Sequence, residues 1–161
     1  MLDRRQCVLI IGEPGCGKSY LSAWLASKWP SHRVWVYAPN DSKHFGPFRH
    51  FKASEPPPVE DNLIIIDDSA YCFTSQGFAT RPYDWTWLLD VVYEGRHKHA
   101  HVIFNIQSIM DLWVRMRNLA SRVYVFRLPP DDLRECVRLF GPRVEQAATL
   151  DRYEYIEIIR Y

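Results

Sequence analysis

The sequence of 161 residues predicts an α/β fold, in which a mainly parallel sheet is flanked by helices. Two observations predict this class: short aliphatic, β-rich runs recur along the chain, and segments with helical periodicity separate them. Parallel strands read as continuous apolar runs because helices cover both faces of their sheet. The composition, 47% hydrophobic and 24% charged, suits one globular domain, which we expect to span residues 1–161.

Five apolar runs are expected to form the core sheet. They are residues 6–11, 34–37, 63–66, 102–106 and 123–126. The alternating tail, residues 153–161, predicts a short C-terminal β extension.

Between the strands, apolar residues recur at helical spacing. Leu21, Leu25 and Trp29, for example, fall four residues apart on one predicted helical face. The predicted helices are residues 19–29, 82–95, 109–119 and 130–140. Residues 39–61 are rich in Pro, Asn, Asp and Ser, and we expect an irregular connection there.

Charge and cysteine content narrow the function classes. With 20 Lys and Arg against 19 Asp and Glu, the chain is not a protein that coats nucleic acid by bulk charge, so any contact must come from a local patch or from a ring of subunits. Four cysteines without a CxxC pair argue against a disulfide framework and against a zinc site, which favours a reducing compartment. No signal peptide and no membrane span are expected, because no apolar run approaches the ~18 residues that a span needs.

A phosphate-binding motif joins the first strand to the first helix. Its residues are Gly12, Glu13, Pro14, Gly15, Cys16, Gly17, Lys18 and Ser19, which match G-x-x-x-x-G-K-[ST] in full. Glycines let the loop curl so that backbone N–H groups point at phosphate oxygens, and the helix start adds a positive pole. Lys18 is expected to contact the β- and γ-phosphates and Ser19 to ligate Mg²⁺, while the following Tyr20 completes the predicted nucleotide-binding set.

An acidic pair closes the third predicted strand. Asp67 and Asp68 follow four aliphatic residues, and strands of open α/β sheets deliver such groups to the edge where ligands bind. Asp67 is expected to hold Mg²⁺, and Asp68 to act as the general base for the attacking water, with Glu13 and Glu94 as alternative bases. Together the two motifs predict a P-loop NTPase of the ASCE type that binds ATP and Mg²⁺ and hydrolyses the nucleotide.

Residues 94–108, with the sequence EGRHKHAHVIFNIQS, resemble the FtsK–HerA superfamily of DNA-pumping ATPases. The likeness is greatest to the branch that packages the genomes of double-stranded DNA viruses. It covers the P-loop, the Asp67 strand and residues 94–127, including a segment like residues 116–120 and a strand like residues 123–127. The chain departs from the family in having Asp68 where Glu is usual, and in lacking the added domains of cellular DNA translocases.

The resemblance implies roles that the motifs alone do not give. Gln107 would be the sensor beside the γ-phosphate, and Arg96 the arginine finger that reaches the neighbouring subunit's site, with Arg117 and Arg122 competing for that role. A finger acting in trans implies a homo-oligomer, expected to be a hexameric ring. The partners implied are double-stranded DNA and a capsid or portal-vertex protein, and the implied location is the host cell cytoplasm, with transient association with a procapsid or virion.

Other functions stay open at this point. A helicase module of a small-element replication initiator carries a similar P-loop, but it would end the fourth strand with an asparagine sensor, where this chain has Asn105-Ile106-Gln107-Ser108. The assembly ATPase of filamentous phages carries a transmembrane segment. A nucleotide-gated switch would hydrolyse slowly, and a small-molecule kinase would use an arginine-rich lid, for which residues 129–145 are the candidate. From position and charge, Arg81, Lys98 and Arg115 are candidate DNA contacts.

Overall fold

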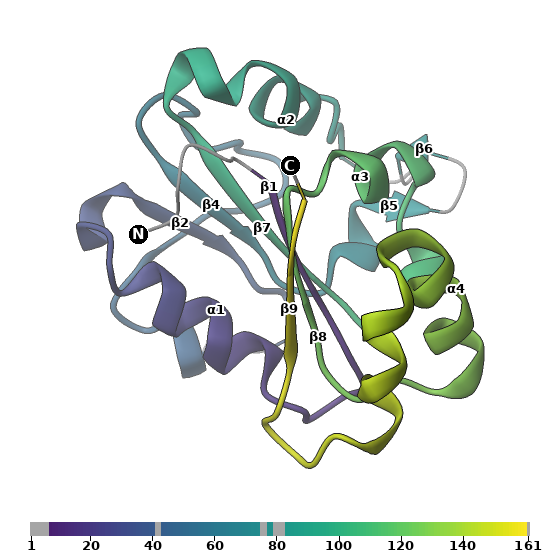
Figure 1. The fold of residues 1–161 in the computed structure, drawn as a ribbon. Coiled ribbons are helices and arrows are strands. Elements are labelled where there is room, and N and C mark those ends of the chain that lie inside the picture. Colours follow the sequence, from purple (N-terminus) through teal and green to yellow (C-terminus); the bar gives the residue numbers. More distant parts are fainter. Residues whose placement is uncertain (1–6, 41–42, 75–76, 79–82, 161) are drawn as a thin grey trace.

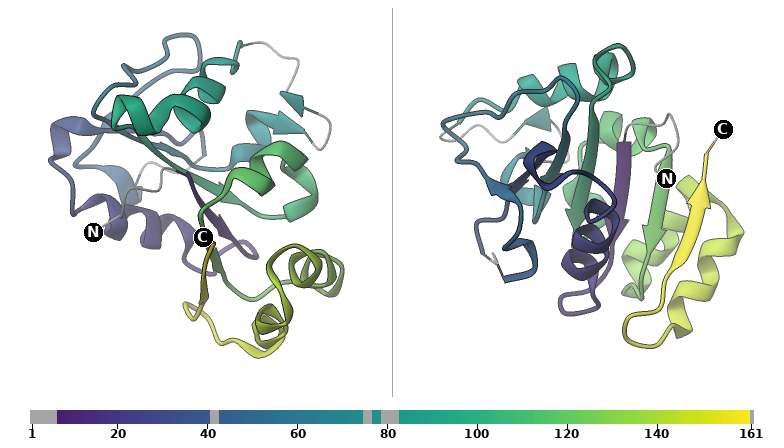
Figure 2. Two further views of the ribbon diagram at one scale, coloured as in Figure 1. Left: turned by 45° about the horizontal axis from the view of Figure 1, so that its top comes forward. Right: turned by 90° about the vertical axis from the view of Figure 1, so that its left-hand side faces the viewer.

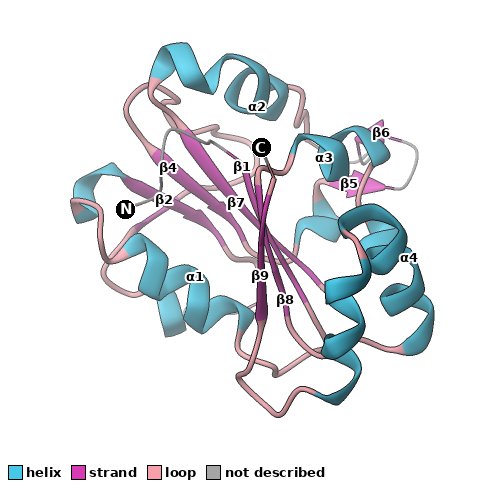
Figure 3. Cartoon of the chain, in the orientation of Figure 1, coloured by secondary structure: helices cyan, strands magenta, loops and turns pink. Residues whose placement is uncertain are grey.

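A computed structural model describes residues 7–40, 43–74, 77–78 and 83–160. Seven strands form one sheet in the order β3-β2-β4-β7-β1-β8-β9 (Figure 1, Figure 3). The strands are β1 (Cys7–Ile11), β2 (Val34–Tyr37), β3 (Arg49–His50), β4 (Leu63–Ile66), β7 (His101–Ile106), β8 (Arg122–Val125) and β9 (Ile156–Ile159). Neighbouring strands pair in parallel except β8 and β9, which are antiparallel. β5 (Phe73–Thr74) and β6 (Gly77–Phe78) form a separate antiparallel pair.

Helices cover both faces of the sheet (Figure 2). They are α1 (Lys18–Ala26), α2 (Trp87–Lys98), α3 (Val114–Leu119) and α4 (Pro130–Phe140). Short 3-10 segments lie at Ser31–Arg33, Lys43–Phe45, Ser69–Tyr71, Ile109–Asp111 and Pro142–Thr149. None of these helices, within the residues described, is long and apolar enough to cross a membrane.

Alternation along the strands divides the core into two parts. In β1, Val8 and Ile10 belong to the cluster that contains Leu21 and Leu25 of α1. The remaining β1 residues, Leu9 among them, belong to the opposite cluster, which contains the buried residues of α2, α3 and α4. Successive side chains of a strand point to opposite faces, so a strand buried on both sides must be apolar throughout.

The strand register brings the functional segments to one edge. In the pairings of β1, Ile11 lies opposite Ile106 of β7 and Val125 of β8. In the next pair, Ile66 of β4 lies opposite Phe104 of β7. The segments that follow β1, β4 and β7 therefore leave the sheet at the same carboxyl edge, where open α/β sheets bind their ligands.

The predicted α/β class, its five core strands and its C-terminal β extension are confirmed. The connection expected to be irregular contains the edge strand β3, which is too short to show a period of two. The helix expected from Pro82, a residue outside those described, begins at Trp87, because Trp85 is buried ahead of it and Asp84 Oδ1 accepts the Thr86 N–H at 2.8 Å.

The helix expected over residues 109–119 is instead broken in two. Ile109–Asp111 forms one 3-10 turn, and α3 begins only at Val114. Leu112 and Trp113 lie between them with extended backbones, at ψ angles of 133° and 134°, so the helical ladder is interrupted there. The guanidinium of Arg117 donates to the carbonyls of Leu112 (2.6 Å) and Met110 (3.1 Å), which gives these carbonyls partners at the break.

Candidate active site

The P-loop connects β1 to α1 and wraps around a lysine. Gly15 and Gly17 have φ angles of 75° and 108°, a left-handed region that glycine adopts without steric cost. The ammonium of Lys18 donates to the carbonyls of Gly12 (2.8 Å) and Glu13 (2.9 Å). The loop thus places the cation at its centre, at the N-terminal end of α1.

Lys18 lies in an environment suited to an anion. Burial lowers the pKa of its ammonium, while the charges of Cys16, Asp67, Asp68 and Glu13 act in the opposite direction. A partly desolvated cation has lost favourable hydration, and bound phosphate oxygens would replace it. This electrostatic environment fits the phosphate binding that the motif predicts.

Ser19 and Asp67 meet across the gap between α1 and the end of β4. The Ser19 hydroxyl lies 3.2 Å from both carboxylate oxygens of Asp67, to which it donates. A hydroxyl and a carboxylate are hard oxygen donors of the kind that Mg²⁺ takes, alongside waters and phosphate oxygens. These two residues, predicted as metal ligands, therefore form a donor pair that fits Mg²⁺.

Asn105 positions Asp67, a role that sequence reasoning missed. The amide of Asn105 donates to Asp67 Oδ1 at 2.7 Å, and its own oxygen accepts from the Ser22 hydroxyl at 2.7 Å. Asn105 and Ser22 are fully buried, so this link between α1 and β7 is closed to water. The sequence signal for this role was an amide side chain within the apolar run of β7, because a buried polar side chain needs a defined hydrogen-bond partner.

Burial raises the pKa of the Asp67 carboxyl, opposed by its hydrogen bonds from Asn105 and Ser19. With its pKa raised in the folded state, the group binds its proton more tightly folded than unfolded. Stability is therefore lost as pH rises from the ordinary aspartate range through the raised pKa, and it stays reduced above that window.

Asp67→Asn is accordingly expected to stabilise the metal-free protein at pH 8, where it removes a buried charge. The gain should vanish at acidic pH, where the wild-type carboxyl is protonated. Thermal unfolding in a chelator at both pH values measures this difference. An equal fall of the unfolding midpoint at both pH values would contradict the interpretation, because it would mean that Asp67 acts through packing and not through charge.

The structure brings together the predicted base and sensor. Asp68 and Gln107 line one hollow of about 240 Å³ with Ala70 and Asp111. Asp68 has a left-handed backbone (φ 59°) and accepts from the Asn40 amide at 3.3 Å. Left-handed geometry is uncommon for a residue other than glycine, and such strain concentrates at functional sites. The turn directs the chain away from β4 immediately after Asp67.

The alternative bases are engaged elsewhere. Arg127 Nε lies 3.2 Å from Glu13 Oε2, so the loop glutamate is paired with the second residue after β8. Glu94 pairs with Lys98 one turn later on α2, at 2.8 Å. These contacts favour Asp68 over both glutamates as the proposed base.

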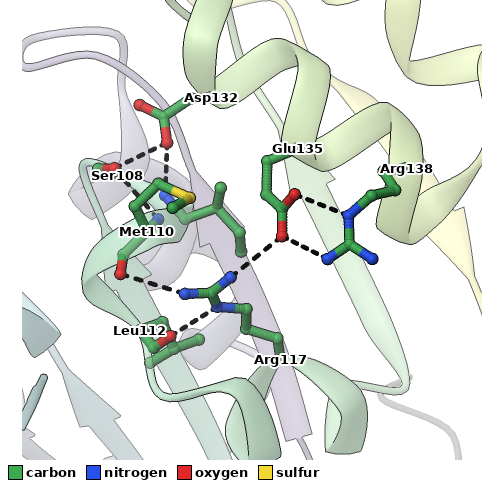
Figure 4. Close-up of polar contacts among 8 residues, drawn as sticks. Ser108, Met110, Leu112, Arg117, Asp132, Glu135 and Arg138 are labelled. Atoms are coloured by element: carbon green, nitrogen blue, oxygen red, sulfur yellow. Dashed lines mark hydrogen bonds and ion pairs between the residues drawn. The ribbon is translucent and has the colours of Figure 1, made fainter. Parts of the chain in front are cut away.

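Arg117 is part of an internal network, shown in Figure 4. Its side chain is only 5% exposed, and besides the two carbonyls it contacts Glu135 Oε1 of α4 at 3.3 Å. It is therefore buried and paired within its own chain, which argues against the alternative that Arg117 serves as the arginine finger. Glu135 also accepts two hydrogen bonds from Arg138, which lies one turn later on the same helix.

The same face of α4 holds the segment that follows the sensor. Asp132 Oδ1 accepts from the Ser108 hydroxyl at 2.7 Å and from the Ile109 N–H at 2.8 Å (Figure 4). The residue after Gln107 is thus fixed to a helix. Gln107 itself is exposed at the end of β7, where its amide can approach a ligand.

Arg96 and Arg122 are the other two candidates for the arginine finger. Arg96 lies in α2, and its side chain is outside the part of the chain that the structure describes. Arg122 is the first residue of β8, so it lies at the edge of the sheet opposite to the edge that carries the P-loop. Its Nε lies 3.4 Å from Glu157 Oε1 of β9.

A second, larger hollow lies beside the P-loop. It measures about 730 Å³, and Gly17, Lys18 and Ser19 form part of its wall. The predicted Tyr20 lies on it, and so does the segment before β9, where Arg152 Nε donates to the Gly15 carbonyl at 3.1 Å. Sequence reasoning missed this segment, because its only signal was an arginine followed by alternating tyrosines.

The parallel sheet, its P-loop and the carboxylate at the end of the neighbouring β4 define a P-loop NTPase fold. In known structures this fold occurs, with a TM-score of 0.76, in the genome packaging NTPase B204 from Sulfolobus turreted icosahedral virus 2 in complex with AMP. The two share 15% sequence identity over 98% of this chain and 94% of that chain. No protein-family model matches the sequence, and no curated protein matches it.

Two more solved structures share the fold. B204, the DNA-packaging ATPase from Sulfolobus turreted icosahedral virus, has a TM-score of 0.71 at 17% identity, over 94% of this chain and 91% of that chain. The N-terminal domain of zonular occludens toxin from Neisseria meningitidis has a TM-score of 0.50 at 15% identity, over 74% and 75% of the two chains. At such identities the likeness is one of fold.

Proposed function

We propose that this protein is an ATP-hydrolysing motor that moves double-stranded DNA and packages a viral genome into a capsid. One observation carries the proposal: Lys18, Ser19 and Asp67 converge at the sheet edge of a fold shared, over nearly the whole of both chains, with a genome packaging NTPase. The solved neighbours include a complex with ATP-gammaS. That complex, together with the DNA-packaging ATPase among the neighbours, supports ATP as the nucleotide here.

Each residue of the edge has a role in hydrolysis. Lys18 binds the β- and γ-phosphates, while Ser19 and Asp67 would hold Mg²⁺, which neutralises charge on the phosphate oxygens. Gln107 orients a water in line with the γ-phosphorus, and Asp68 accepts its proton. The new phosphorus–oxygen bond forms as the bond to the bridging oxygen breaks, which releases ADP and phosphate.

The proposed motor function also implies partners. We expect a hexameric ring around duplex DNA, in the host cell cytoplasm, docking on a capsid or portal-vertex protein. Lys98 and Arg115 stay candidates for contacts with the DNA backbone, and Arg81 lies outside the described residues. In the isolated chain Lys98 pairs with Glu94, and Arg115 lies over the Trp113 ring at 5.3 Å.

The kinase alternative is less well supported. It needs an arginine-rich lid, but Arg134 and Arg138 pair with Asp131 and Glu135 one turn away on α4. Pairs of this spacing are interactions along one helix face.

Steady-state ATP hydrolysis across protein concentration, with and without duplex or single-stranded DNA, tests the proposal. A ring-forming motor should show turnover that rises steeply with concentration and is stimulated by duplex more than by single strands. Turnover indifferent to both would contradict the packaging function and point to a monomeric kinase or switch.

Arg96→Ala should lower the turnover of pure rings at least roughly tenfold, if Arg96 acts in trans as the arginine finger. Mixing it with Lys18→Ala should restore part of the activity, because a Lys18→Ala subunit still supplies its arginine to an intact P-loop next door. The matched control is Arg134→Ala, at an exposed arginine of α4, which should keep wild-type turnover. Full activity of pure Arg96→Ala rings would remove Arg96 from the site.

A further inference from the structure

Exposed aromatic side chains gather around the larger hollow beside the P-loop. Tyr20 (65% exposed) and Trp24 (47%) line it from α1. Tyr153 (59%) and Tyr155 (41%) line it from the segment before β9. Large apolar groups left in water at one concave place mark a surface that binds something.

The hollow lies where a nucleoside would leave the phosphate loop. Asp68 and Gln107, the proposed groups at the γ-phosphate, line the separate smaller hollow. Lys18 and Ser19, at the start of α1, form part of the wall of the larger one. A triphosphate with its last phosphate toward Gln107 therefore directs its ribose and base into the aromatic hollow.

Tyr155 is held in place by buried aromatic rings. Its ring meets Tyr124 edge-on with centroids 5.4 Å apart, and it meets Phe126 at 5.5 Å. Tyr124 lies within β8 and Phe126 directly follows that strand, and both are buried, at 4% and 2% exposed. A stacking surface fixed in this way loses little side-chain freedom when a ligand binds, so more of the contact energy appears as affinity.

The segment that carries these tyrosines is fastened to the phosphate loop. The Arg152 hydrogen bond to the Gly15 carbonyl joins residues 137 positions apart. The Arg152 guanidinium lies over the Tyr153 ring at 4.9 Å, and that ring packs on Gly17, where an added Cβ would lie 2.8 Å from Tyr153 Cδ1. Tyr153 also has a left-handed backbone (φ 73°), a strained conformation that functional sites retain.

We propose that this aromatic hollow binds the nucleobase and ribose of the nucleotide, with Tyr153 and Tyr155 as stacking residues and purine nucleotides as the favoured class. The proposal rests on the proposed nucleotide site at the P-loop. Stacking depends on ring area more than on hydrogen bonds, so ATP and GTP should bind with similar affinity and both more tightly than CTP.

Isothermal titration of three magnesium-loaded ligands tests the proposal: ATP, CTP and inorganic tripolyphosphate, which lacks base and ribose. Wild-type protein should bind ATP more tightly than tripolyphosphate. Tyr155→Ala should weaken ATP binding roughly 5- to 100-fold, the range of a lost base–aromatic stack, and leave tripolyphosphate binding unchanged. Tyr155→Phe keeps the ring and should bind as wild type, and Tyr93→Ala, at an exposed tyrosine of α2, is the matched control.

Lys18→Ala separates the two claims. It should weaken all three ligands; unchanged tripolyphosphate binding would instead overturn the phosphate site. Equal wild-type affinities for ATP and tripolyphosphate, with the Lys18 effect intact, would overturn the nucleobase site alone. The nucleobase site would also be overturned by a Tyr155→Ala protein that loses self-association but keeps wild-type ATP affinity, because the hollow would then bind a second copy of the chain. If Tyr155→Ala does not fold, Tyr20→Ala, on the exposed wall, must show the same selective loss of ATP.

Discussion

Lys18→Ala is expected to lower the rate of ATP hydrolysis roughly 10³-fold or more, because it removes the cation that stabilises charge on the transferred phosphoryl group. Lys18 is the cation enclosed by the P-loop, with its ammonium 2.8 Å and 2.9 Å from two loop carbonyls. Its burial weakens its hydration and lowers its pKa, so it gains most when phosphate binds.

Steady-state turnover of purified wild-type and Lys18→Ala protein measures this effect. Lys52→Ala is the matched control, because Lys52 is an exposed lysine in the connection between β3 and β4. The control should keep wild-type turnover, and both variants should keep the secondary structure of the parent. Wild-type turnover in Lys18→Ala would contradict the assignment of the phosphate site.

Gly12→Ala is expected to destabilise the fold by about 1–3 kcal/mol, the usual cost of overpacking, and to lose nucleotide binding. A Cβ on Gly12 would lie 2.6 Å from Phe126 Cβ and 2.7 Å from Cys16 Sγ. Phe126 cannot move aside freely, since its ring is buried and its N–H donates to the Ile11 carbonyl at 2.9 Å. The loop must shift instead, which displaces the carbonyls around Lys18.

Urea unfolding of Gly12→Ala and Gly46→Ala provides the comparison. Among the residues that the structure describes, none has an atom within 4 Å of a Cβ built on Gly46, and the φ of Gly46 is not left-handed. Gly46→Ala should therefore be neutral, or stabilising by up to about 1 kcal/mol through the unfolded chain. Equal unfolding free energies for the two variants would refute the close-packing account of Gly12.

The local sequence pattern was enough to predict the five core strands of the sheet and the P-loop part of the site. Runs such as residues 63–66 are apolar because both sheet faces are covered, and the P-loop motif defines its own strand–loop–helix context. Placement of Asp67 beside Ser19 then follows from the rule that parallel strands end at one edge. These inferences depend on contacts that every P-loop fold must make.

Contacts between distant residues could not be predicted in the same way. Ser22 and Asn105 are 83 positions apart, and neither belongs to the P-loop motif or to the acidic pair. Arg117, an alternative arginine finger in the sequence, instead donates to carbonyls at the break in its own predicted helix. Arg152 reaches the P-loop because β9 pairs antiparallel with β8. The alternating pattern of residues 153–161 suggested a β extension but did not show which strand it would pair with.

The most direct test of the motor is displacement of a triplex-forming strand from duplex DNA. With ATP, the wild-type protein should strip the third strand from a duplex long enough for its ring to load, and Lys18→Ala or a non-hydrolysable ATP analogue should leave it bound. A wild-type protein that hydrolyses ATP yet leaves the triplex intact on every duplex length would contradict DNA translocation, while the P-loop NTPase assignment would stand.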